Sequence, residues 1–189
     1  MQFLKLLLGF APWLAFLFIA HDSLFRLKVG LVVALLLSIA MGLMRLHRGV
    51  ILWVGLIFFS ASTLAVIWFE NMWTVRHMGI LANSAMAVAT WYTVLVKRPF
   101  TMDYARDHTP PELWSHPAFL RTNLIITSAW SLCFTLNAVV AWHKMSLHSL
   151  PDWQYEAISY TFMLLCAMTS TWYPAYLKRQ RAALAGTAS

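Results

Sequence analysis

Charged residues are scarce in this 189-residue sequence, at 11 %, whereas hydrophobic residues make up 60 % of it. Soluble domains contain about 25 % charged and about 45–50 % apolar residues. A water-soluble fold could not bury so much apolar surface. The composition therefore excludes a soluble domain and indicates that a lipid bilayer is the solvent.

Cysteine and the common signatures of catalysis are also scarce. Only Cys133 and Cys166 occur, both inside apolar runs, so zinc-type spacings are missing and we expect inert packing thiols. The seven histidines lie in loops or near segment ends, not at mid-span where a haem between helices would need them. A nucleophile elbow, a phosphate-binding glycine loop and a paired-carboxylate motif are missing too. We therefore expect no catalytic residue, no metal and no cofactor.

Six apolar segments fill most of the chain. They cover residues 3–20, 29–44, 49–69, 78–96, 122–142 and 155–177. A membrane-spanning helix needs about 20 residues, and lipid offers no partner to an unpaired backbone, so these segments must be helical. The alternation of a membrane β-strand is missing from them. The sequence predicts one all-α domain over residues 1–189, a polytopic transmembrane bundle of six spans.

The basic residues set the expected orientation. With six spans, both termini and the second and fourth loops share one side of the membrane. That side holds ten of the fourteen Lys and Arg residues. The positive-inside rule then places both termini in the cytoplasm. Topology also accounts for the net charge of +7, so no nucleic-acid partner is expected, because such a partner needs a basic face on a soluble module.

The longest polar interruption is the fourth loop, residues 97–121, which we call the connector. Pro99 is expected to stop the preceding helix, and TPPE at residues 109–112 reads as a capping box. Ser115 is a second start signal, so we predict one or two short helices lying at the interface. The expected interfacial anchors are Phe100, Met102, Tyr104, Trp114 and Phe119. The candidate cytoplasmic interaction residues are Lys97, Arg98, Pro99, Phe100, Tyr104, Arg106 and Trp114.

A second candidate set is polar and lies inside the membrane. Four of its members recur every four residues and therefore share one helix face, while Asn137 lies on another face. Such side chains usually join helices by hydrogen bonds, and lining a substrate path is the alternative. Acidic residues are missing from mid-membrane positions, which argues against proton-coupled transport but leaves a passive pathway open. The set is Asn83, Asn123, Thr127, Ser131, Thr135 and Asn137.

Several residue combinations are similar, in order, to those of one known family. They are Ala11 and Pro12, Phe69-Glu70-Asn71 before Arg76, Lys97-Arg98-Pro99, and Trp114 ahead of Asn123, Trp130, Phe134 and Asn137. On these features the chain resembles the intracellular septation protein A family of small polytopic bacterial inner-membrane proteins. The resemblance implies a multi-pass protein of the bacterial cytoplasmic membrane without catalytic activity. It also implies a role in envelope integrity and septation, through contacts with cell-division and elongation membrane proteins.

Three functions stay open from the sequence. The first is a non-enzymatic septation or envelope-integrity factor that acts through protein or lipid contacts. The second is a small-molecule or ion permeation unit that uses the polar face of the fifth span. The third is a lipid-modifying enzyme built on the connector residues Asp103, Arg106, Asp107 and His108. Membrane lipid is an expected partner in each case, and a homo-oligomer is compatible with all three.

Overall fold

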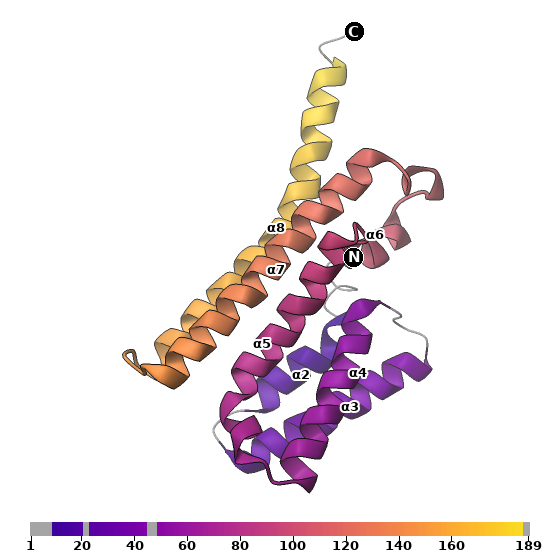
Figure 1. Ribbon diagram of the computed structural model, residues 1–189. Coiled ribbons are helices and arrows are strands. Elements are labelled where there is room, and N and C mark those ends of the chain that lie inside the picture. Colours follow the sequence, from indigo (N-terminus) through magenta and orange to yellow (C-terminus); the bar gives the residue numbers. More distant parts are fainter. Residues whose placement is uncertain (1–8, 21–22, 45–48, 187–189) are drawn as a thin grey trace.

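The computed structural model describes residues 9–20, 23–44 and 49–186, and this part of the chain folds into helices and turns without a strand (Figure 1). The all-α prediction is confirmed for it. Residues 3–8 of the first predicted span, and Arg45 and Arg48 of the second loop, lie outside the described residues.

The elements are α2 (Ala11–Ile19), α3 (Leu24–Leu43), α4 (Val50–Thr63), a π-helical turn (Leu64–Trp68), α5 (Met72–Leu95), α6 (Thr101–Ala105), 3-10 turns (Arg106–His108 and Pro111–Leu113), α7 (Pro117–Ser146) and α8 (Asp152–Gly186).

Several helices begin earlier than hydropathy predicts, because polar residues cap them. Ser23 Oγ accepts a hydrogen bond from Arg26 N at 3.2 Å and starts α3 five residues before the expected span. Asn71 Oδ1 accepts from Thr74 N at 3.0 Å and starts α5 six residues early. Each cap satisfies one of the backbone N–H groups that a helix leaves free in its first turn. The first turns are therefore helical although they are too polar to count as apolar segments.

Four helical segments are long and apolar enough to cross a membrane: Leu24–Leu43, Val50–Trp68, Met72–Leu95 and Pro117–Ser146. By the same criteria of length and hydropathy, α2 and α8 are not candidate spans. Only nine residues of α2 form a described helix, and α8, at 35 residues, includes polar turns at both ends. The described part of the chain is therefore an all-helical protein of the membrane-spanning type with four candidate spans.

Neighbouring helices in the sequence pack against one another in space. The pairs α2–α3, α3–α4, α4–α5 and α7–α8 are all in contact, and α5 packs along α7 in the most extensive contact. Figure 1 shows the long α7–α8 pair on one side and the shorter α2–α4 group on the other, with α5 between them. This arrangement makes α5 the link between the two halves.

Two apolar cores stabilise this arrangement. One lies among α3, α4, α5 and the end of α2, around Leu31, Phe59 and Val66, which are at most 1 % exposed. The other joins α2, α5, α6, α7 and α8, and includes Phe10 and Trp130, whose rings stack at 5.5 Å. Because α6 contributes to this second core, this part of the connector packs against the bundle.

Candidate functional site

The connector begins with a tight turn that reverses the chain after α5. Arg98 N donates to Thr93 O at 2.9 Å and Lys97 N donates to Val94 O at 3.0 Å. This pair of bonds is a Schellman motif, in which Lys97 takes the left-handed position with φ 55°. Pro99 follows in a buried position and has no N–H with which to continue the helix. The turn directs the next segment back into the protein.

Residues 99–102 and Tyr104 of the connector are buried, which corrects part of the prediction. Phe100 is 1 % exposed and Tyr104 8 %, and Pro99 and Met102 are buried with them. The Phe100 ring meets Phe10 edge to face at 6.0 Å. The expectation that Phe100, Met102 and Tyr104 reach into lipid headgroups is therefore wrong. An apolar side chain near a membrane surface can be buried in protein as easily as in lipid, and hydropathy does not distinguish the two.

Burial also changes the chemistry of Tyr104. Removal from water disfavours the phenolate and raises the pKa of Tyr104 above its ordinary value, and the nearby Asp103 raises it further. This ring lies close to the backbone just before α2, because a Cβ added to Gly9 would clash with it. Tyr104 is therefore a buried, neutral side chain and not part of the outer surface.

The second half of the connector is exposed and held in shape by its own contacts. The Arg106 guanidinium lies 5.4 Å from the centre of the Trp114 ring, a cation–π distance. Trp114 Nε1 donates to Thr109 O at 2.8 Å. Lys97 and Arg98 are exposed as well. Four of the predicted interaction residues therefore lie on the outside of the protein: Lys97, Arg98, Arg106 and Trp114.

The expected helix-start signals in the connector are only partly correct. A short helix does occur at Pro111–Leu113, but the Thr109 hydroxyl donates back to Ala105 O at 2.9 Å instead of capping it. The capping-box interpretation is therefore wrong. At the start of α7, His116 Nδ1 accepts from Ala118 N at 3.2 Å, so His116 and not Ser115 is the cap.

The structure places most of the predicted intramembrane polar face inside the protein. Thr101 Oγ1 of α6 lies 2.9 Å from Thr127 Oγ1 and donates to Asn123 O at 3.1 Å, so these hydroxyls join α6 to α7. Thr135 Oγ1 accepts from Trp91 Nε1 of α5 at 3.1 Å. Ser131 Oγ donates within its own helix, to Thr127 O at 2.9 Å. This row of side chains therefore joins helices.

The two remaining members of that set lie apart from the row. Asn83 is half-buried, and its Nδ2 donates to Gly79 O of the same helix at 2.8 Å. Asn137 is 4 % exposed, with its Nδ2 3.7 Å from Cys133 Sγ. Asn137 Oδ1 is buried without a hydrogen-bond partner in the described structure. The structure does not bring Asn83 and Asn137 into the cluster around Thr127.

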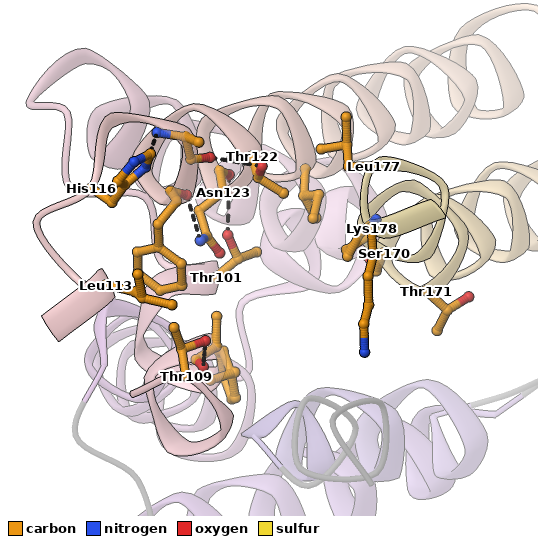
Figure 2. A pocket seen from close by; sticks show the side chains of 16 residues that line it. Thr101, Thr109, Leu113, His116, Thr122, Asn123, Ser170, Thr171, Leu177 and Lys178 are labelled. Carbon is orange, nitrogen blue, oxygen red and sulfur yellow. Dashed lines mark hydrogen bonds between the residues drawn. The ribbon is translucent and has the colours of Figure 1, made fainter. Parts of the chain in front are cut away.

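A pocket of about 410 Å³ lies where the connector meets α7 and α8 (Figure 2). Thr101, Thr109, Thr122 and Asn123 line it from α6, the connector and α7. From α8 come Ser170, Pro174 and Lys178, which sequence analysis did not select. The proline inside α8 was the available signal, because a proline within a helix leaves a backbone carbonyl without its usual partner.

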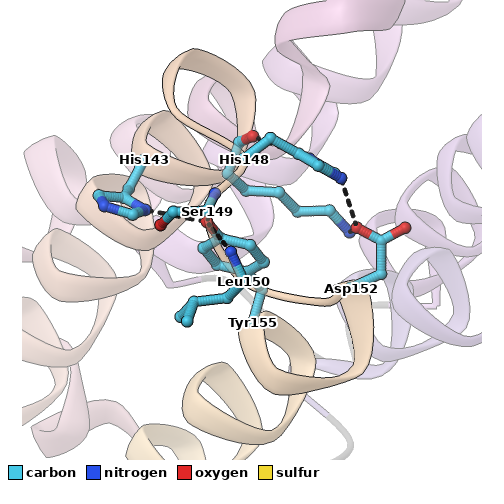
Figure 3. Close-up of polar contacts among 7 residues, drawn as sticks. His143, His148, Ser149, Leu150, Asp152 and Tyr155 are labelled. Atoms are coloured by element: carbon cyan, nitrogen blue, oxygen red, sulfur yellow. Dashed lines mark hydrogen bonds and ion pairs between the residues drawn. The ribbon is translucent and has the colours of Figure 1, made fainter.

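The opposite end of the α7–α8 pair holds a polar cluster that closes the turn between them (Figure 3). The Tyr155 hydroxyl accepts from Ser149 N at 3.1 Å and lies 3.0 Å from His143 Nδ1. Lys144 Nζ pairs with Asp152 Oδ1 at 3.1 Å. These contacts fix the turn, and we assign them a structural role.

In the described part of the chain, no three His, Cys, Asp or Glu side chains lie close enough to hold a metal ion. Cys133 and Cys166 are buried free thiols. Comparison with known proteins gives no match to a family model, a curated protein or a solved structure. The class of protein therefore follows from the helices alone: an all-helical chain of the membrane-spanning type with a folded connector at one end.

Proposed function

We propose that this chain is a six-span protein of the bacterial cytoplasmic membrane with both termini and the connector on the cytoplasmic side. The packing of Phe10 at the start of α2 against Phe100 supports this, because it brings that end of α2 to the connector. Exposed cations gather at the same end, on Lys97, Arg98, Arg121 and Lys178. Helix α8 is 35 residues and about 52 Å long, enough to cross a hydrocarbon layer of about 30 Å.

The proposed role is that of a non-enzymatic envelope-integrity or septation factor acting through protein or lipid contacts. The observation that carries it is the shape of the connector. Its first half is anchored in the core by Phe100 and Tyr104, while Arg106 and Trp114 stay outside. A surface that is already ordered loses little conformational entropy when a partner docks. Cell-division or elongation membrane proteins are the partners that the family resemblance implies.

The intramembrane polar face gives less support to a permeation pathway. Thr127 and Ser131 are 0 % exposed and hydrogen-bond within the protein, which favours a joining role over lining a path. Flux through liposomes is the direct test of the permeation alternative. A flux that Asn123→Leu and Thr127→Val abolish while the fold persists would favour permeation over the contact role.

Site-specific photo-crosslinking in the membrane tests the contact role. A photoreactive residue at Trp114 should give a discrete protein adduct. The same residue at Trp172, an exposed aromatic position on α8, is the matched control and should give lipid adducts. At Tyr104, which is 8 % exposed, it should give no adduct with a partner protein. Lipid adducts alone from Trp114 would contradict a protein partner at the connector.

A further inference from the structure

The hydroxyl groups that line the pocket already donate to backbone carbonyls. Thr122 Oγ1 donates to Ala118 O at 2.8 Å, and Thr109 Oγ1 donates to Ala105 O at 2.9 Å. Ser170 Oγ donates to Cys166 O at 2.9 Å and already accepts from Trp130 Nε1 at 2.9 Å, which occupies one of its two lone pairs. A hydroxyl has one proton and two lone pairs, so each of these oxygens is left as an acceptor. Toward a ligand, this wall of the pocket therefore accepts hydrogen bonds.

Two further acceptors belong to residues that line the pocket. Asn123 Nδ2 donates to Phe119 O at 2.9 Å, which leaves the amide Oδ1 as the group with capacity to accept. Pro174 has no N–H, so the Ser170 carbonyl cannot receive the usual bond from four residues ahead. Asn123, Ser170 and Pro174 all line the pocket. A suitable ligand therefore brings several hydrogen-bond donors.

The charge and the apolar lining narrow the ligand class further. No Asp or Glu is among the residues that line the pocket, whereas Lys178 lies on its exposed rim. A cationic ligand would meet no counter-charge, but an anion would meet Lys178. Phe119, Ile126 and Leu177 supply apolar wall. A volume of about 410 Å³ is within the range of about 300–1,000 Å³ for small-molecule sites, and suits a headgroup with the first part of its chains.

We propose that this pocket binds the glycerol-phosphate headgroup of an anionic membrane lipid. The phosphate lies by Lys178, the glycerol hydroxyls donate to Asn123 Oδ1 and the Thr122 oxygen, and the first chain carbons lie along Phe119 and Leu177. A choline headgroup has neither hydroxyl donors nor a net negative charge, so it binds more weakly. The inference rests on the proposed membrane location but not on the proposed orientation, because it concerns the pocket itself.

Binding is measured with the full chain in a non-ionic detergent, by titration with dioctanoyl phosphatidylglycerol under native mass spectrometry or calorimetry. The comparison ligands are dioctanoyl phosphatidylcholine, dioctanoyl phosphatidic acid and free glycerol 3-phosphate. We expect phosphatidylglycerol to bind at least about tenfold more tightly than each of these. Phosphatidylcholine lacks the net negative charge and the hydroxyl donors, phosphatidic acid lacks the glycerol hydroxyls of the headgroup, and glycerol 3-phosphate lacks the acyl chains. Equal binding of glycerol 3-phosphate would indicate a site for a soluble phosphate and would overturn the lipid assignment.

Two isosteric variants test the acceptor wall. Thr122→Val and Asn123→Leu should each weaken phosphatidylglycerol binding by about three- to tenfold. Thr161→Val is the matched control, because the exposed Thr161 hydroxyl makes the same bond within α8, to Ala157 O at 2.7 Å, far along the helix from the pocket. Circular dichroism and gel filtration establish that all three variants fold.

Lys178→Gln tests the charge on the rim and should reduce the preference for phosphatidylglycerol over phosphatidylcholine by about threefold, as expected for an exposed ion pair. Lys144→Gln, at the other end of the α7–α8 pair, should leave that preference unchanged. Unaltered binding in Thr122→Val and Asn123→Leu, or an equal loss in the control variants, would overturn the proposal. Since a micelle has no sides, a wrong orientation would not affect these results.

Discussion

The turn at Lys97 gives a sharp test of how the connector is held. Lys97 has φ 55°, and its side chain is exposed. A left-handed conformation costs an L-residue about 1–2 kcal/mol, a cost that glycine does not have. Glycine has more conformational freedom in the unfolded chain, which offsets about 0.4–1 kcal/mol of that gain. We therefore expect Lys97→Gly to raise the free energy of unfolding by about 0.5–1 kcal/mol.

Equilibrium unfolding in mixed micelles with increasing sodium dodecyl sulfate measures this change. Lys97→Ala is the control, because it removes the same charge but keeps a Cβ in the left-handed region, and it should give no gain. Lys178→Gly, inside α8, should instead lower the free energy of unfolding by about 0.5–1 kcal/mol. Equal effects of glycine and alanine at Lys97 would refute the conformational argument.

The remaining predictions concern the hydroxyl contact, the orientation and Tyr104. Thr101→Val removes the hydroxyl that joins α6 to Thr127 and should lower the free energy of unfolding by about 1–3 kcal/mol in the same assay; a change near zero would contradict a joining role. In a cysteine-free background, a thiol at Ser115 should resist an impermeant maleimide in intact cells, whereas one at Ser149 should react, and the reverse pattern would invert the topology. The raised pKa of Tyr104 means that the folded state favours the neutral phenol. The free energy of unfolding should therefore fall as the pH rises above the ordinary tyrosine pKa of about 10. Tyr104→Phe should reduce that fall.

The apolar helices could be predicted from the sequence because their residues have one requirement, removal from water. Hydropathy alone predicted the regions that became α3, α4, α5 and α7, and four-residue spacing predicted that Thr127 and Ser131 share a face. Helix starts were misplaced where Ser23 and Asn71 cap polar first turns. Side-chain caps depend on one local hydrogen bond, and an average over a window of residues does not detect it.

The connector and its pocket were predicted less well, because their environment depends on distant parts of the chain. Phe100 is buried because Phe10 and Trp130 form the wall beside it. The pocket forms because Ser170 and Lys178 of α8 lie beside Thr122, about fifty residues earlier in the chain. No local pattern around Thr122 contains that information. Helix pairing supplies it, and pairing between membrane helices leaves only weak signals in a single sequence.

The π-helical turn at the end of α4 has a consequence for the direction in which the chain enters α5. Phe69 N donates to Leu64 O, five residues back, at 3.1 Å, so this turn holds one residue more than a regular α-helical turn. Since each α-helical residue advances about 100° around the axis, deleting one residue here would swing Trp68 and Phe69 by about that angle. The single additional residue thus serves as an angular spacer that sets which way this aromatic end of the helix points.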